Sequence, residues 1–327
     1  MINPDFIWTA HPFETQLYIR NPAIEFSFCF EPYLFNTARH QNSQLQNTIL
    51  TFLLKKDKVQ KPIAVIHLTQ GSDHCYRSPS SAPFGGVQCA RNCDLPELLF
   101  FMGCIEKWIL TREGKRITIK TAPSCYTAKS HIQLHQMYCA MGFSSIYQHL
   151  NHHIEVSRIP FYQTITNAER RRLKKSVNAG FDTVQYKADS FSTIYEFLKT
   201  SYENKNYNLS MTRSRLEALI TEFPDDCIVF AVKDKDRIIA LSLTVRINKT
   251  ILYNFLPAAL AAYNKFSPSV MLTQAIYEYC QHENITILDL GISLDQNGLE
   301  KPGLLHFKKN IGGKDSLKIC YQKDILK

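Results

Sequence analysis

The pattern of apolar and polar positions is clearest in residues 251–293. Bulky β-forming residues open this stretch and predict a strand. After an irregular loop, Ser267 precedes Pro268, as at the start of a helix, and apolar residues recur from Val270 at helical spacing. A short apolar strand then ends at Gly291. The order is strand, loop, helix and strand, and the free N–H groups at the helix start are a natural place for an anion or a polarised carbonyl.

The same kind of patterning predicts alternating strands and helices elsewhere. Asp94, followed by Pro96 and Glu97, reads as a capping box that opens a helix running to about Arg112. The other main predicted elements are strands at 63–68, 115–121, 227–232, 237–246, 250–256 and 316–321, an extended segment at 145–157, and helices at 127–141, 191–202 and 212–222.

The two halves of the chain repeat this order. In each half a strand containing a tyrosine, Tyr76 or Tyr253, leads through an irregular loop and a helix to an Ile-Thr-Ile strand, at 117–119 or 285–287. A period this long predicts duplicated domains rather than a solenoid. Chance similarity between two α/β units is the alternative.

The composition shows that the protein is basic. The 327 residues are enough for two domains, and 38 Lys and Arg against 29 Asp and Glu give a net charge of +9. That excess favours a polyanionic partner such as RNA, a nucleotide cofactor or an anionic lipid surface, with simple solubility as the alternative. The N-terminus has no signal-peptide pattern, no apolar run approaches the ~20 residues of a membrane span, and the cysteines form no C-x-x-C pair. We therefore expect reduced thiols in a cytoplasmic protein.

Four short motifs span most of the chain. They are the Ser-Pro and Pro-Phe-Gly-Gly loop at 78–86, the basic helix at 170–175 with Gly180 after it, Leu-Asp-Leu-Gly at 288–291, and Leu-His-Phe-Lys at 305–308 with Gly312-Gly313. In this order they make the chain resemble the FemAB-like tandem-GNAT acyltransferases, the group around the peptidoglycan aminoacyltransferases. Two departures stand out: Ile311 replaces an aromatic residue, and residues 258–262 lack the glycines of the ordinary GNAT pyrophosphate loop.

The resemblance implies an α/β fold of two tandem GNAT-like domains, each a twisted mixed sheet flanked by helices. The expected domains are residues 1–157 and 158–315, the second carrying the basic helix 167–178, while the final strand, 316–327, returns to complete the first domain. The implied function is an N-acyltransferase that moves an aminoacyl or acyl group to an amine acceptor bound between the domains. The alternative is a catalytically inactive module that binds RNA or an envelope precursor.

The resemblance also bears on donors and partners. No tightly bound cofactor and no metal are expected, and the donor is either an aminoacyl-tRNA or an acyl-CoA. The basic helix favours a nucleic-acid or nucleotide phosphate, and the missing glycines argue mildly against coenzyme A. The acceptor carries an amine, as a cell-envelope precursor does, and peripheral contact with a membrane is compatible with this. The expected phosphate contacts are Arg170, Arg171, Arg172, Lys174 and Lys175.

Three residues carry the implied chemistry. Lys308 resembles the family lysine near the transferring carbonyl, where a cation stabilises the developing oxyanion. Tyr253 or Tyr263 is the candidate to protonate a leaving group, with a place in the core as the alternative for both tyrosines. Asp289 either holds the acceptor amine or caps a turn. Between Phe307 and Lys309, Lys308 reads as solvent-facing, so Lys308→Ala is expected to cut turnover and leave the fold intact. The expected substrate-binding residues are Tyr76, Arg77, Ser78, Phe84, Gly85, Tyr263 and Ser267.

One further pattern invites a metal. His131, His135 and Cys139 are spaced four residues apart and share one face of a predicted helix, which is a possible spacing for zinc ligands. Neither a fourth ligand nor a glutamate between the histidines accompanies them, and the histidines at 149–153 do not complete a set. The sequence therefore predicts no metal site.

Overall fold

The computed structural model describes residues 2–44, 48–57, 59, 61–186, 190–205 and 207–325. The chain divides into two compact units. Unit 1 comprises Met1–His149 with Leu317–Lys327, and unit 2 comprises Leu150–Ser316. Both are mixed α/β structures, as predicted. None of the helices in the described part of the chain is both long enough and apolar enough to cross a bilayer.

Unit 1 is built on a sheet with the strand order β1-β2-β3-β4-β5-β7-β14, in which, among the described residues, only β5 and β7 run parallel. The short strand β6 pairs with β4. These strands are β1 (Phe6–Ala10), β2 (Phe13–Arg20), β3 (Ile49–Lys56), β4 (Ala64–Gln70), β5 (Cys75–Ser78), β6 (Gln88–Cys89), β7 (Arg116–Lys120) and β14 (Lys314–Asp324).

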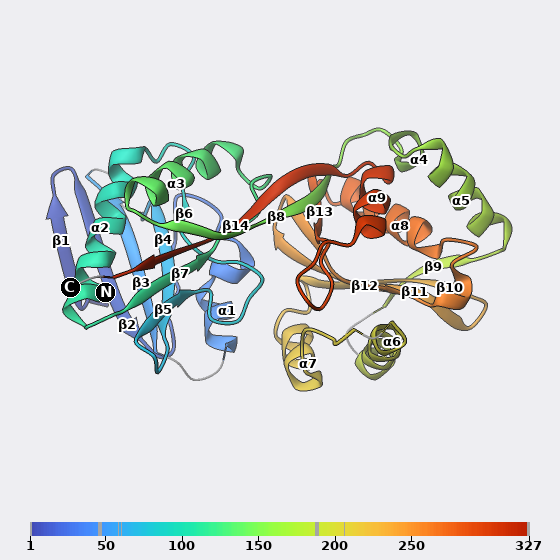
Figure 1. Ribbon diagram of the computed structural model, residues 1–327, viewed down its shortest axis with the longest axis horizontal. Coiled ribbons are helices and arrows are strands. Elements are labelled where there is room, and N and C mark those ends of the chain that lie inside the picture. Colours follow the sequence, from blue (N-terminus) through green and yellow to red (C-terminus); the bar gives the residue numbers. More distant parts are fainter. Residues whose placement is uncertain are drawn as a thin grey trace. The chain divides into compact units, whose positions relative to one another are not determined.

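Helices lie on both faces of this sheet. Helices α2 (Leu95–Thr111) and α3 (Ala128–Ala140) cover one face, whereas η1 (Leu34–Asn36) and α1 (Ala38–Ser43) lie on the other, where His67 Nε2 contacts Asn36 O. The predicted capping box opens α2, and Glu97 Oε2 accepts a hydrogen bond from the Asp94 N–H at 2.8 Å. Helices α2 and α3 pack against each other on the same side of the sheet (Figure 1). Their apolar faces bury Phe52, Phe101 and Trp108 in the core of the unit.

Unit 2 is built on a sheet with the order β8-β13-β12-β11-β10-β9. The predicted meander forms β10, β11 and β12, and the only parallel pair among these strands in the described residues is β12 with β13. The strands are β8 (Ser144–Glu155), β9 (Asp182–Tyr186), β10 (Cys227–Asp234), β11 (Arg237–Asn248), β12 (Ile251–Ala259) and β13 (Ile287–Ile292).

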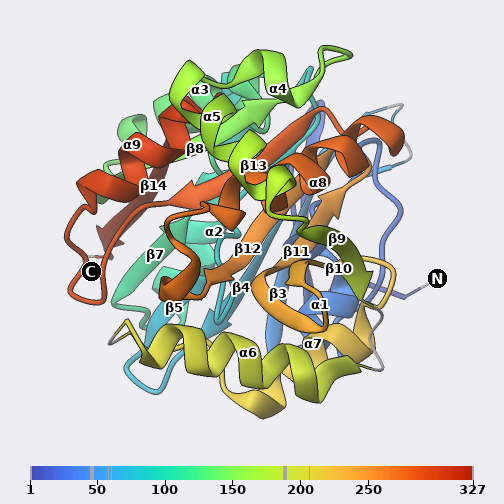
Figure 2. The ribbon, with the colours of Figure 1, turned by 90° about the vertical axis from the view of Figure 1, so that its right-hand side faces the viewer.

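Helices cover both faces of the unit 2 sheet. Helix α8 packs with α5 on one face, and α6 and α7 lie on the other (Figures 1 and 2). Helix α8 begins at Pro268, as predicted, but Ser267 adopts φ +55° and its side chain makes no capping bond. The helices are α4 (Phe161–Thr164), α5 (Asn167–Asn178), α6 (Phe191–Glu203), α7 (Arg213–Glu222), η3 (Ala261–Tyr263), α8 (Pro268–His282) and α9 (Pro302–Asn310).

The two halves of the chain exchange their last strands. Strand β14 returns to pair with β7 of unit 1, as the resemblance implied, while β8 leaves the first half and pairs with β13 of unit 2. The compact units therefore divide inside β8, between His149 and Leu150, because this continuous strand serves both. The expected domain limits of 1–157 and 158–315 stay a prediction, and residues 326 and 327 of the expected final strand lie outside the described residues.

Candidate functional site

The most distinctive backbone feature of unit 2 is the divergence of β12 and β13. The two strands pair in parallel over only three positions and part after Tyr253 and Asp289. Strand β12 continues against β11 and β13 continues against β8, each with a shift of register close to this point. Phe255 is skipped in the pairing with β11, so the ladder of backbone hydrogen bonds is interrupted there. The two strands therefore splay apart, and the backbone ladder between them ends at this opening.

Asp289 is fixed at the start of the divergence. Its side chain is 1% exposed, and its Oδ1 accepts hydrogen bonds from Gly291 N at 2.8 Å and Asn151 Nδ2 at 2.9 Å. Gly291 has φ +72°, and a Cβ there would lie 3.2 Å from the Tyr253 ring. Glycine is therefore required both by the backbone conformation and by the close approach of the tyrosine. Of the two roles expected for Asp289, the contacts account for the turn cap.

Lys308 lies in the last turn of α9 and points into unit 2. Its Nζ donates to Gly291 O and Ile292 O, both at 2.8 Å, immediately beyond the divergence. Only 6% of the residue is exposed, so the expectation of a solvent-facing lysine was wrong. Burial lowers the pKa of Lys308 to about 8, against the opposing effect of the Asp289 carboxylate. A lysine has three N–H donors, so the two carbonyls leave one for a substrate atom.

Tyr253 faces the same opening. It pairs with Asp289 across the two strands, is half-buried, and lies beside Gly291. Burial, followed by the negative charge of Asp289, raises the pKa of Tyr253, so the phenol stays protonated at neutral pH. The structure thus brings together Tyr253, Asp289 and Lys308, the three residues expected to carry the chemistry.

Strand β8 adds polar residues to this region that the sequence reasoning did not select. Asn151 is fully buried and also donates to Ser316 Oγ at 3.2 Å. His152, fully buried, has its Nε2 3.2 Å from Asp315 Oδ1, and burial with the nearby Lys308 cation lowers its pKa. The sequence did contain a signal for them. Asn151, His152 and His153 are three consecutive polar residues in a predicted extended segment, and alternate residues of a strand point to opposite faces, so polar groups lie on both faces.

Tyr263 and Ser267 lie in the connection between β12 and α8. The Tyr263 hydroxyl donates to Asp234 Oδ2 at 2.9 Å, and Ser267 Oγ donates to Asn264 O at 3.3 Å. Both side chains therefore make local contacts that shape the connection, and their expected role in substrate binding stays a prediction.

In unit 1 the corresponding loop is closed on itself. Tyr76 is 0% exposed and packs edge-on against Trp108, and Phe84 is 1% exposed, so both belong to the core rather than to an open surface. Ser78 Oγ accepts from Gly86 N at 2.9 Å, and Gly85 N donates to Lys120 O at 2.8 Å. Each of Tyr76, Ser78, Phe84 and Gly85 thus helps to build the loop, and their expected role in substrate binding stays a prediction.

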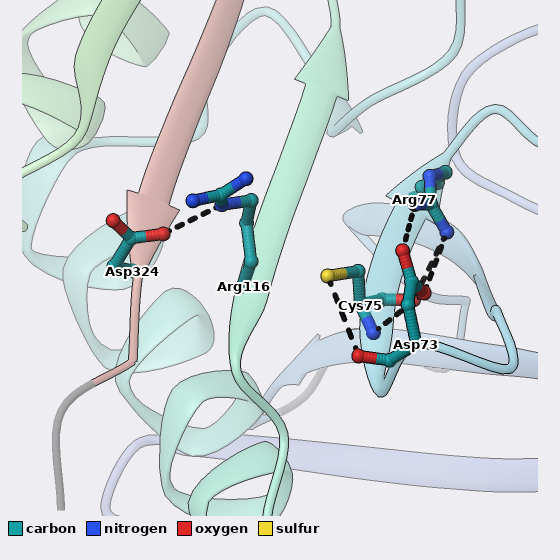
Figure 3. A network of polar contacts seen from close by, with 5 residues as sticks. All are labelled: Asp73, Cys75, Arg77, Arg116 and Asp324. Atoms are coloured by element: carbon teal, nitrogen blue, oxygen red, sulfur yellow. Dashed lines mark hydrogen bonds and ion pairs between the residues drawn. The ribbon is translucent and has the colours of Figure 1, made fainter.

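Arg77 is the partly exposed member of this group. Figure 3 shows its guanidinium turned onto the Asp73 carboxylate, to which it is bonded at 2.5 and 3.2 Å. The Arg77 hydrogen bond is the largest cause of the lowered pKa of Asp73. A second ion pair, between Arg116 and Asp324 at 2.6 Å, ties β7 to β14 in the same view. Arg77 is therefore engaged within its own hairpin.

The basic helix α5 carries the five expected phosphate contacts. Arg170 donates to the carbonyls of Tyr162 and Gln163, and Arg172 pairs with Glu169 at 2.5 Å. The remaining three, which are Arg171, Lys174 and Lys175, are exposed, and Lys175 lies over the Phe266 ring. Two of the five charges are thus committed to local contacts.

The described residues contain no group of three or more His, Cys, Asp or Glu side chains placed to hold a metal ion. His131, His135 and Cys139 do lie along α3, as their spacing predicted. His135 and Cys139 are in contact, with Cys139 Sγ 3.7 Å from His135 Nε2.

Several known proteins are similar to this chain in sequence or in structure. Residues 162–309 match the family model of the acetyltransferase (GNAT) domain. The crystal structure of FemX resembles this chain with a TM-score of 0.68 at 13% identity, over 89% of this chain and 92% of that chain. A tandem GNAT protein from the clavulanic acid biosynthesis pathway gives 0.52 at 8% identity, over 85% and 83%. The C-terminal domain of a putative lysylphosphatidylglycerol synthetase from Agrobacterium fabrum gives 0.51 at 11%, over 80% and 81%.

No curated protein sequence matches this chain. At identities this low the structural likeness establishes a shared fold and leaves the chemistry to be argued from the residues. Each half contains one parallel strand pair, β5 with β7 and β12 with β13, and the GNAT match covers the half that holds Lys308. The chain therefore shares its fold with FemX and with a tandem GNAT protein, and its residues 162–309 match the model of the GNAT acetyltransferase domain.

Proposed function

We propose that the protein is an N-acyltransferase whose reaction centre lies where β12 and β13 diverge in unit 2. The observation that carries the proposal is the buried Lys308 ammonium, held by Gly291 O and Ile292 O beside that opening. Burying a charged lysine is costly, and a chain selected for stability alone would favour an apolar side chain there. A buried cation at a backbone opening fits a carbonyl oxygen that becomes negative during reaction.

The proposed mechanism divides the work among three groups. The acceptor amine attacks the donor carbonyl, and Lys308 together with backbone N–H groups of β12 stabilises the oxyanion. As the tetrahedral intermediate collapses, Tyr253, which stays protonated at neutral pH, donates its proton to the leaving group, and the resulting phenolate takes the proton that the acceptor amine loses. Asp289 positions the loop through Gly291 and favours the cationic form of Lys308.

The donor we favour is an acyl-CoA, because the GNAT match covers the half that contains the proposed centre. An aminoacyl-tRNA is the second candidate, supported by the exposed charges Arg171, Lys174 and Lys175 on α5. The acceptor is an amine, and the likeness to FemX supports a cell-envelope precursor as its source. Neither donor requires a resident metal or a tightly bound cofactor.

The test is transfer by the purified full-length chain. A panel of acyl-CoA thioesters is mixed with a panel of amines, and release of free thiol and formation of amide are both followed. A parallel arm uses charged tRNA with a label on the amino acid. Amide formation that needs the protein and is reduced on the order of a hundredfold by Lys308→Met supports the proposal. Binding of RNA or an envelope precursor without turnover in any arm would instead indicate an inactive binding module.

A further inference from the structure

Strands β12, β13 and β8 carry two rows of side chains across the sheet of unit 2. Residues directly opposite each other on neighbouring strands point to the same face. The row that packs with α8 in the apolar core consists of Leu252, Leu288 and Ile154. The next row consists of Tyr253, Asp289 and His153, and successive residues of a strand alternate between faces. A polar row therefore lies on the face turned away from α8, and Asn151, two residues from His153, belongs to the same face.

Two hydrogen-bond acceptors on this face are buried and unused. Asn151 is 0% exposed and His153 is 7% exposed. Among the residues that the structure describes, neither Asn151 Oδ1 nor His153 Nδ1 has a hydrogen-bond partner. Asn151 Nδ2 is identified by its bond to the carboxylate of Asp289, which can only accept, so the unpartnered atom of Asn151 is its oxygen. Buried acceptors without donors are costly, and this pair therefore indicates a ligand that supplies N–H groups.

His153 is held in the form that can accept a proton. Its side chain hydrogen-bonds to the backbone of Lys314 in a way that favours the charged imidazole, as a bond donated to a carbonyl does. Because Nδ1 has no partner, the donating nitrogen is Nε2, and Nδ1 keeps its lone pair.

The charges around His153 leave it neutral at neutral pH. Burial is the largest cause that lowers the pKa of His153 below its ordinary value of 6.5, and the carboxylates of Asp289 and Glu155 oppose it. The cation of Lys314 on β14 and the neighbouring His152 on β8 act in the same direction as burial. The imidazole is therefore available as a base, and the Asp289 carboxylate stabilises it once it has taken a proton.

We propose that Asn151 Oδ1 and His153 Nδ1 form the subsite for the acceptor amine, and that His153 takes the first proton from it. This rests on the proposed acyl transfer. An aliphatic amine arrives as an ammonium ion, which has three N–H donors and no acceptor, and so matches two unused acceptors. His153 Nδ1 takes one proton, and the lone pair left on nitrogen attacks the donor carbonyl.

The protons of the whole reaction then balance. The second proton of the amine goes to Tyr253 as the intermediate collapses, and the leaving group takes the proton that Tyr253 gave up. The imidazolium of His153 releases the first proton to solvent. An ammonium ion and a thioester thus give an amide, a thiol and one free proton.

The first readout needs no turnover. The full chain is labelled with nitrogen-15 histidine, and the His153 signals are assigned by their loss in His153→Gln. At pH 7 the ring should carry its proton on Nε2 and none on Nδ1, and its pKa should lie below 6.5. A proton on Nδ1 at pH 7, in either a neutral or a charged ring, would overturn the role of His153 whatever the activity of the protein.

The second readout compares two amines with the acyl-donor panel. Ethylamine is an ammonium ion at neutral pH, whereas the fluorines of trifluoroethylamine lower its basicity and leave it neutral. His153→Gln should lower turnover with ethylamine on the order of a hundredfold, and with trifluoroethylamine by less than about threefold. The fall of kcat/KM for ethylamine below pH 6.5 should disappear in this variant, and Asn151→Leu should raise KM for ethylamine more than it lowers kcat.

The control is His282→Gln, because the His282 side chain is 83% exposed and pairs with Glu283; it should match the unmodified protein. Equal losses with the two amines, or an unchanged rate with ethylamine in His153→Gln, would contradict the proposal. Absence of transfer by the unmodified protein would count against the acyltransferase itself, and the position of the His153 proton would still decide whether Nδ1 can act as a base.

Discussion

Replacing Lys308 by methionine should lower turnover strongly while changing the free energy of unfolding only slightly. Methionine has similar length and no charge, so it removes the ammonium while filling most of the space. The expected loss is about 3 kcal/mol of transition-state stabilisation, or on the order of a hundredfold in turnover, which is typical of removing one fixed donor to an oxyanion. Lys308→Arg keeps the charge and should retain part of the activity.

The effect on stability is the sum of two opposing terms. Burial lowers the pKa of Lys308 from 10.5 to about 8, which corresponds to about 3 kcal/mol against the charged form in the folded protein. Removing the charge relieves that penalty but leaves Gly291 O and Ile292 O without their donor, at a cost of about 1–3 kcal/mol for each carbonyl. The two terms nearly offset each other, so Lys308→Met should shift the free energy of unfolding by only about 1–2 kcal/mol.

The pH dependence of stability and of kcat tests the charge state of Lys308 more directly. The pKa of Lys308 is lower in the folded protein than in the unfolded chain, so the unfolded chain binds more protons between pH 8 and 10.5. Relative to Lys308→Met, the wild-type protein should therefore gain stability as the pH rises through that window and show no difference in slope below it. If the cation is the active form, kcat should fall as the pH rises through about 8. Lys308→Arg should lack this fall, because arginine stays charged.

The assay is single-turnover acyl transfer between pH 6 and 10 with the donor identified from the panel, alongside urea unfolding. Lys309→Met is the matched control, since Lys309 is the next residue, is exposed, and contacts Asp315 instead. It should alter turnover by less than about twofold. A kcat that rises through pH 8 would make neutral Lys308 a base, and equal turnover in Lys308→Met would remove it from the mechanism.

Three further changes test other parts of the structure. Gly291→Ala forces a side chain into a φ of +72° beside the Tyr253 ring, and should cost about 1–3 kcal/mol in urea unfolding; an unchanged midpoint would contradict the strained turn. Asp94→Ala removes the capping box of α2 and should cost about 1 kcal/mol, seen as a lower Tm. Arg171→Glu with Lys174→Glu should flatten the log–log salt dependence of RNA binding by roughly one unit or less per lost contact. An identical slope would leave both as a solvated helix face.

The elements with the strongest local signals were predictable from sequence. The strand–strand–strand–helix–strand order of 227–290 follows from alternating apolar residues, short polar turns and the proline at the start of α8. The capping box at Asp94 located α2 to within one residue of its end. These features depend on neighbours in the chain, so a pattern a few residues long contains the information.

The burial of Lys308 could not be predicted in this way. Its neighbours in sequence, Phe307 and Lys309, give no sign of it, because the two oxygens that hold its ammonium belong to β13. The pairing of β8 with β13 could not be predicted for the same reason. Its extended character was predicted, yet its exchange into unit 2 is decided by pairing with residues more than a hundred positions away. Such contacts are set by tertiary packing, which a local pattern does not record.

The two halves differ in how their parallel strand pair ends. Each unit contains a parallel strand pair, β5 with β7 and β12 with β13, formed by the same order of elements. In unit 1 the following loop folds back, and Gly85 forms a bridge with Thr121 that continues the pairing along β7. In unit 2 the pairing of β12 with β13 ends at Tyr253 and Asp289, and Gly291 O, which accepts from the Lys308 ammonium, lies just beyond that end. Gly85 thus extends the parallel pairing in unit 1, while the pairing in unit 2 stops short at the place where we propose the reaction centre.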